Sequence, residues 1–205
     1  MSDEHWYRNS DWSPEIEERF EAKLARSRSQ KAQYLRIQGS ILKERHPAKA
    51  IELLQRCVAE GNPFFIAHAH AEMGDAFYRL GNVDRAIQAF EAAMDQEARE
   101  PMFGTNAALD YALRVALPER ADRYDRALAV LDPGGEGFLP SMAFEAAAAR
   151  APVHAARGAA HAARAAGARA LAQLDCAGPI PGYPEVGAVT DNDHPLFERL
   201  RAIAS

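Results

Sequence analysis

The segment from residues 67 to 100 constrains the fold more than any other part of the sequence, because it carries helical periodicity on both sides of one glycine, Gly81. The first half has Gly74 near its centre, and the second half contains Ala86 and Phe90. Small residues let two helices cross closely, and a neighbouring ring fills the space around the crossing. The segment therefore predicts a helix-turn-helix hairpin with a close contact at Gly74.

The rest of the chain repeats this plan less regularly. Ala50 precedes Ala86 by close to the length of one helical repeat, which is about 34 residues. Residues 124–128 restate the residue types of 83–87, and an alanine-rich unit follows at 141–177. No stretch shows the alternation of β-branched residues that is typical of strands. The predicted fold class is all-α, with about four helical hairpins.

Three parts of the chain are distinguished by composition. Residues 1–30 combine an aromatic segment, Trp6 to Trp12, with a helix whose start is marked by Ser13 and Pro14. We expect the helix to cap the stack, and the aromatic segment either to cap it as well or to occupy its groove. Residues 31–177 hold the repeats. Residues 178–205 form a tail rich in proline and glycine that leads into a final helix. We expect this helix to cap the last hairpin through its apolar residues, Leu196, Phe197 and Leu200.

The segment 67–100 closely resembles the tetratricopeptide repeat family. His70 stands where the family has its first large aromatic residue. The aromatic start Trp6-Tyr7-Arg8-Asn9 also resembles a group of bacterial repeat proteins. The resemblance implies a right-handed superhelical stack, in which the first helix of each hairpin lines a concave face. It assigns structural roles to Met73, Gly74, Phe77, Tyr78, Gly81, Ala86, Phe90 and Ala93.

Charge and composition restrict the class of partner. The chain of 205 residues has 24 basic and 29 acidic residues, a formal net charge of −5, so it lacks the positive field that attracts nucleic acid or anionic lipid. No apolar run approaches the roughly 20 residues that cross a bilayer, and the start is polar. We expect a cytoplasmic protein that binds neither nucleic acid nor membrane. Cys57 and Cys176 are widely separated and are expected to be reduced, structural thiols.

The expected binding surface is the concave face of the stack. Side chains there that do not hold helices together are free to contact a ligand. We therefore predict a non-catalytic scaffold or adaptor for a protein or peptide, with no cofactor. An alternative is an immunity-type protein that neutralises a toxin, since an acidic binder suits a basic toxin. The residues expected on the concave face are Arg36, His68, Glu72, Asp75, Arg79, Asp110 and Arg114.

A metal-dependent enzyme is a lower-ranked alternative. His68 and His70 are two residues apart on a helix and point in nearly opposite directions, so they cannot bind one ion. His68, Glu72 and Asp75 share a face and could supply ligands. The glycines at 134–137 lack the spacing of a phosphate-binding loop, and the run Asp191-Asn192-Asp193 lacks the glycine of a calcium loop. We expect no metal site and no catalytic residue.

Overall fold

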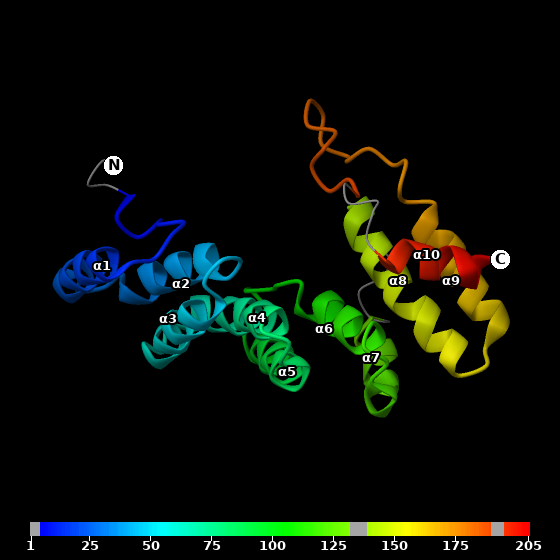
Figure 1. Ribbon diagram of the computed structural model, residues 1–205, viewed down its shortest axis with the longest axis horizontal. Helices are drawn as coiled ribbons and strands as arrows, with labels where there is room; N and C mark the ends of the chain where they lie inside the picture. The colour runs from blue at the N-terminus through cyan, green and yellow to red at the C-terminus, as the bar shows by residue number, and fades with distance from the viewer. Residues whose placement is uncertain (1–4, 132–138, 190–194) are drawn as a thin grey trace. The chain divides into compact units, whose positions relative to one another are not determined.

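The computed structural model describes residues 5–131, 139–189 and 195–205, which contain ten α-helices and no strand (Figure 1). The predicted all-α class is confirmed. The glycine-rich segment 134–137 and the acidic run 191–193 lie outside the described residues. Two compact units, residues 1–107 and 108–205, divide the chain within the stretch that we expected to be one repeat domain, and they are described separately. Among the helices described, none is long and apolar enough to cross a membrane.

The first unit contains five helices whose starts follow ordinary capping chemistry. Ser13 accepts a hydrogen bond from the Ile16 backbone, and Asn62 accepts one from Phe64 at 3.1 Å. Each cap satisfies an N–H group that a helix start leaves without a partner. The helices are α1 (Pro14–Arg26), α2 (Lys31–Leu42), α3 (Pro47–Ala59), α4 (Pro63–Arg79) and α5 (Val83–Arg99).

These helices pack as two similar hairpins, α2 with α3 and α4 with α5, and α4 also contacts α2 and α3. Each hairpin has a glycine at its crossing. A methyl group on Gly74 would lie 2.6 Å from the Phe90 ring, and one on Gly39 would lie 2.7 Å from Leu54. Both distances are far below van der Waals contact, so only glycine allows these crossings. Gly39 thus has the same role in the first hairpin that Gly74 has in the second.

The aromatic N-terminal segment packs against α1 and α2. The Asn9 backbone N–H donates to the Gln38 side chain at 2.9 Å, and the Gln38 amide donates to the Asn9 carbonyl at 2.7 Å. Both residues are buried, so each satisfies polar groups of the other. The Trp6 ring lies 5.3 Å from Phe20 and 4.8 Å from Tyr34. The segment therefore covers the end of the first unit that α1 and α2 form.

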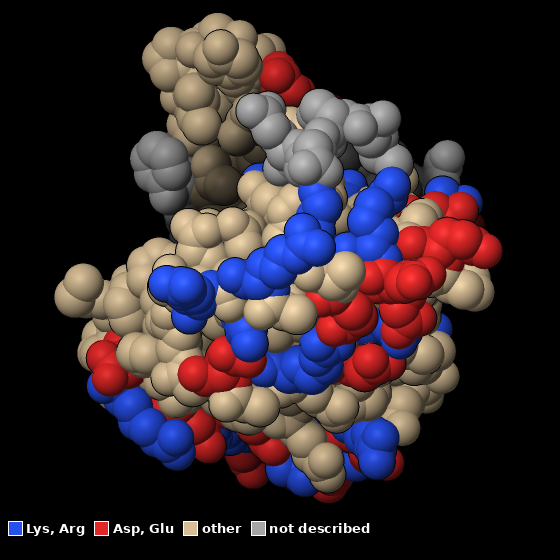
Figure 2. Space-filling view, turned by 90° about the vertical axis from the view of Figure 1, so that its left-hand side faces the viewer, with Lys and Arg blue, Asp and Glu red and all other residues tan. Residues whose placement is uncertain are grey.

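Ion pairs join α1 to α3 on the outer side of the same unit. Lys49 on α3 lies 2.8 Å from Glu17 on α1, and Arg56 lies 2.6 Å from Glu21. Figure 2 shows how basic and acidic side chains alternate on this face of the molecule. Pairs this exposed contribute about 0–1 kcal/mol each, so they orient α1 more than they stabilise it.

The second unit ends in a hairpin, formed by α8 and α9, that the last helix of the chain covers. α8 and α9 pack together across a turn at Gly158, whose φ of 71° suits glycine, and α10 lies against both helices. Leu196, Phe197 and Leu200 of α10 are buried, and the Phe197 ring stacks 5.3 Å from Phe144. The helices of this unit are α6 (Ala107–Ala116), α7 (Tyr124–Leu131), α8 (Pro140–Ala156), α9 (Ala160–Leu171) and α10 (Pro195–Ala204), with a short 3-10 helix, η2, at Ala121–Arg123.

Candidate functional site

Charged residues that we expected to face a ligand are instead paired between α2 and α4. The Arg36 guanidinium donates to Glu72 at 2.8 Å, and Lys43 donates to Asp75 at 2.7 Å. Arg79 forms an ion pair with Glu44, which follows α2. Three cation–carboxylate pairs therefore connect the two hairpins along this face, which we call the α2–α4 face. Its side chains contribute to the stacking of the hairpins.

The remaining predicted binding residues occupy different settings. His68 is on α4, one turn before Glu72, and its Nδ1 is buried without a hydrogen-bond partner among the described residues. Burial lowers the pKa of His68, and the nearby Arg36 lowers it further. Asp110 and Arg114 are on α6 in the second unit, where both make interactions with other groups.

Glu72 is the most buried carboxylate of the α2–α4 face, at 9% exposure. Burial raises the pKa of its carboxyl above the usual value, although Arg36 and the Ser40 hydroxyl act in the opposite direction. A carboxyl with a raised pKa binds a proton more readily in the folded state than in the unfolded state. Ionised Glu72 therefore reduces stability, and this cost appears as the pH rises through and above about 4.5, the ordinary pKa of glutamate.

The substitution Glu72→Gln removes this cost while keeping an oxygen that can accept from Arg36. We expect the variant to gain in free energy of unfolding relative to the parent as the pH rises from 4 towards 7, by about 1.4 kcal/mol for each unit of pKa shift removed. Urea unfolding at both pH values measures the difference. Glu18→Gln, on an exposed part of α1, controls for the change in net charge. A difference that stays constant with pH would show that burial does not raise this pKa.

The two carboxylates that could join His68 at a metal ion are each paired with a basic side chain. Oε1 of Glu72 pairs with Arg36 and Asp75 pairs with Lys43, whereas Oε2 of Glu72 is buried without a hydrogen-bond partner among the described residues. Across the described residues, no group of three or more histidine, cysteine, aspartate or glutamate side chains could hold a metal ion.

The two thiols differ in environment. Cys57 is fully buried in the core of the first unit, and burial raises the pKa of its thiol to about 12, with a further contribution from Glu72. A thiol with this pKa stays protonated at neutral pH and is a poor nucleophile. Cys176 is exposed after α9, and its thiol donates to the Ala172 carbonyl at 3.3 Å.

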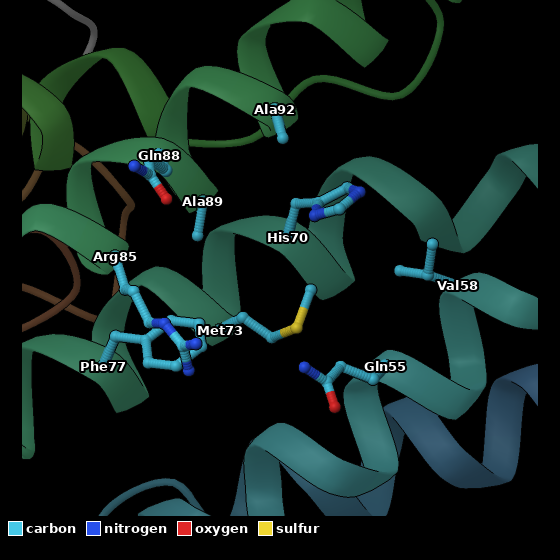
Figure 3. A pocket seen from close by; sticks show the side chains of 9 residues that line it. All are labelled: Gln55, Val58, His70, Met73, Phe77, Arg85, Gln88, Ala89 and Ala92. Carbon is cyan, nitrogen blue, oxygen red and sulfur yellow. The ribbon is translucent and has the colours of Figure 1, made fainter.

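A groove with a volume of about 370 Å³ lies between α3 and α5, with α4 beneath it. This volume falls within the roughly 300–1,000 Å³ of ordinary ligand sites. Figure 3 shows Met73 extending along the floor towards Gln55, with Arg85 lying beside Phe77 at one end. The floor and walls are mainly apolar. The residues that line it are Gln55, Val58, His70, Met73, Phe77, Arg85, Gln88, Ala89 and Ala92.

The polar side chains of this groove differ from those of the α2–α4 face, because none of them has a hydrogen-bond or ion-pair partner among the residues that the structure describes. The Arg85 guanidinium carbon lies 5.5 Å from the centre of the Phe77 ring, a cation–π contact that leaves its N–H groups available. Burial lowers the pKa of His70, so its imidazole is neutral at pH 7. Gln55 and Gln88 are exposed at the rim, where their amides can both donate and accept.

The sequence did not predict this groove. Ligand binding was expected on the first helix of each hairpin, whereas the walls of the groove come from the second helices, α3 and α5. Of the lining residues, the predictions included only Met73 and Phe77, and only as packing residues. The sequence feature that could have indicated the groove is the presence of exposed polar residues, such as Gln55 and Gln88, beside the apolar stripes of α3 and α5.

A second hollow, of about 320 Å³, lies in the second unit between α6, α8 and α10. Leu113, Phe144 and Phe197 give it an apolar lining. Val189 also lines this hollow, and it adjoins residues 190–194, which lie outside the described part of the chain. The candidate site is therefore the groove of the first unit.

The comparisons with known proteins add no relative. No model of a protein family, no curated protein and no solved structure matched this chain.

Proposed function

We propose that this protein is a non-catalytic scaffold that binds a protein or peptide in the groove between α3 and α5. The single observation that carries the proposal is the contrast between the two surfaces of the first unit. Charged side chains of the α2–α4 face are paired with one another, whereas the polar side chains of the groove have no hydrogen-bond or ion-pair partner among the described residues. An apolar floor with a few free polar groups is typical of a binding site.

The architecture supports a repeat scaffold of the tetratricopeptide type. The hairpins α2–α3 and α4–α5 have equivalent glycine crossings at Gly39 and Gly74. Stacked hairpins of this kind leave grooves between neighbouring helices, and these grooves can accept an extended or helical peptide. Met73 suits such a role, because its flexible side chain adapts to different apolar groups.

Blocking the groove tests the proposal. Ala92 on α5 lines the groove and is half-buried, so Ala92→Arg places a long charged side chain in it without disturbing the core. Ala98→Arg, on an exposed part of the same helix, is the matched control. We expect a partner captured from native cells by the parent chain to be lost with Ala92→Arg and retained with Ala98→Arg. Equal capture by both variants would exclude the groove, provided that circular dichroism shows both to be folded.

A further inference from the structure

Residues 178–189, between α9 and α10, form a closed and well-supported loop. The Gly178 backbone N–H donates to the Pro184 carbonyl at 2.6 Å. The Gly187 carbonyl accepts from the Ser141 N–H at 2.8 Å, which satisfies a donor at the start of α8. The backbone at position 178 lies so close to that of residue 186 that even a methyl group there would clash, at 1.8 Å. These contacts fix the shape of the loop.

The loop presents apolar side chains to solvent. Ile180, Tyr183 and Val186 are three of the six large apolar residues exposed in the described chain, and Tyr183 is 59% exposed. Glu185 is the only charged residue between 178 and 189. Figure 1 shows the loop, in orange, extending away from α8 and α9. Compact loops with exposed apolar groups are commonly interaction sites, because such exposure does not favour folding.

The groove of the first unit complements this loop in both polarity and charge. It offers an apolar floor, Met73 and Phe77, to an aromatic side chain, and it carries Arg85, which has no carboxylate partner among the described residues. We infer that the loop of one copy binds the groove of a second copy, with Tyr183 against the floor and Glu185 paired with Arg85. This inference rests on the proposed function of the groove.

The contact joins two different surfaces, so each copy keeps one free loop and one free groove. Such a contact is heterologous, and it builds chains or rings instead of a symmetric dimer. The loop also competes with any outside partner for the groove. Self-association therefore reduces binding of that partner at high protein concentration.

Sedimentation velocity of the full chain, from micromolar to millimolar concentration, measures the association. We expect the mean mass to rise with concentration. Glu185→Arg should weaken association about tenfold or more, since a close charge pair at an interface contributes more than 1.4 kcal/mol. Tyr183→Ser should weaken it to a similar extent, because it removes the ring that lies against the apolar floor. Glu198→Arg, an exposed residue of α10, makes the same change of charge outside the loop and should have no effect.

A charge exchange gives the sharper result. Arg85→Glu and Glu185→Arg should each be monomeric alone, but an equimolar mixture should associate again, because the loop of each variant then carries the charge opposite to that of the other variant's groove. The two variants should alternate in the chains or rings that form. Concentration-independent mass for the parent chain, or no association in the mixture, would overturn the inference. The proposed function would stand separately if Ala92→Arg still abolished capture of an outside partner.

Discussion

Gly74→Leu is expected to lower the free energy of unfolding by about 3 kcal/mol or more, because overpacking of a core costs about 1–3 kcal/mol and this site has little room to relax. The first added carbon alone would lie 2.6 Å from two carbons of the Phe90 ring. That ring is fully buried between α4 and α5 and cannot move into solvent. Urea unfolding followed by circular dichroism measures the loss.

Gly104→Leu is the matched control, because a side chain at Gly104 would meet nothing within 4 Å. It should change stability by no more than about 0.5 kcal/mol. Combining Gly74→Ala with Phe90→Leu should cost less than the sum of the two single changes, since the smaller side chain makes room for the added methyl group. If Gly74→Leu unfolds at the same urea concentration as the parent, then α4 and α5 do not cross closely at Gly74.

Removal of residues 178–205 is expected to have a comparably large effect on the second unit. The deletion exposes the faces of α8 and α9 that Leu196, Phe197 and Leu200 now cover. Burying one such side chain contributes about 1.5–3 kcal/mol, so the loss is on the order of 5 kcal/mol. That amount is comparable with the whole stability of a small domain. Calorimetry should show a lower melting temperature, and the dye anilinonaphthalene sulfonate should bind the truncated chain.

The double substitution Tyr183→Ser and Val186→Ser distinguishes the contribution of the exposed loop to stability from that of α10. Both side chains are exposed, so replacing them should leave the melting temperature nearly unchanged when it is measured at low protein concentration. A truncated chain as stable as the parent would contradict the covering role of α10.

The hairpins were predictable because their determinants are local. Helical spacing, a turn at Gly81 and small residues at Gly74 and Ala86 all lie within one segment, and each restricts the backbone directly. Gly39 was missed, although it has the same contact with Leu54 that Gly74 has with Phe90. The first hairpin matches the repeat less well in sequence, so its glycine carried little weight by itself.

The functional surface was less predictable because it depends on contacts between hairpins. Helical periodicity placed Arg36 and Glu72 on outward faces, but only the packing of α2 against α4 shows that they pair with each other. The groove likewise depends on the separation of α3 and α5, which no single helix determines. The buried Asn9–Gln38 hydrogen bonds belong to the same class, since they join residues 29 positions apart.

Hydrogen exchange of the full chain, measured alone and with a captured partner, tests the central claim most directly. Partner binding stabilises the helices that it contacts, so their amides exchange more slowly. If the groove is the binding site, protection will appear in α3 and α5, around Gln55 and Gln88 and extending to Arg85. Protection confined to α2, or to the second unit, would contradict the account.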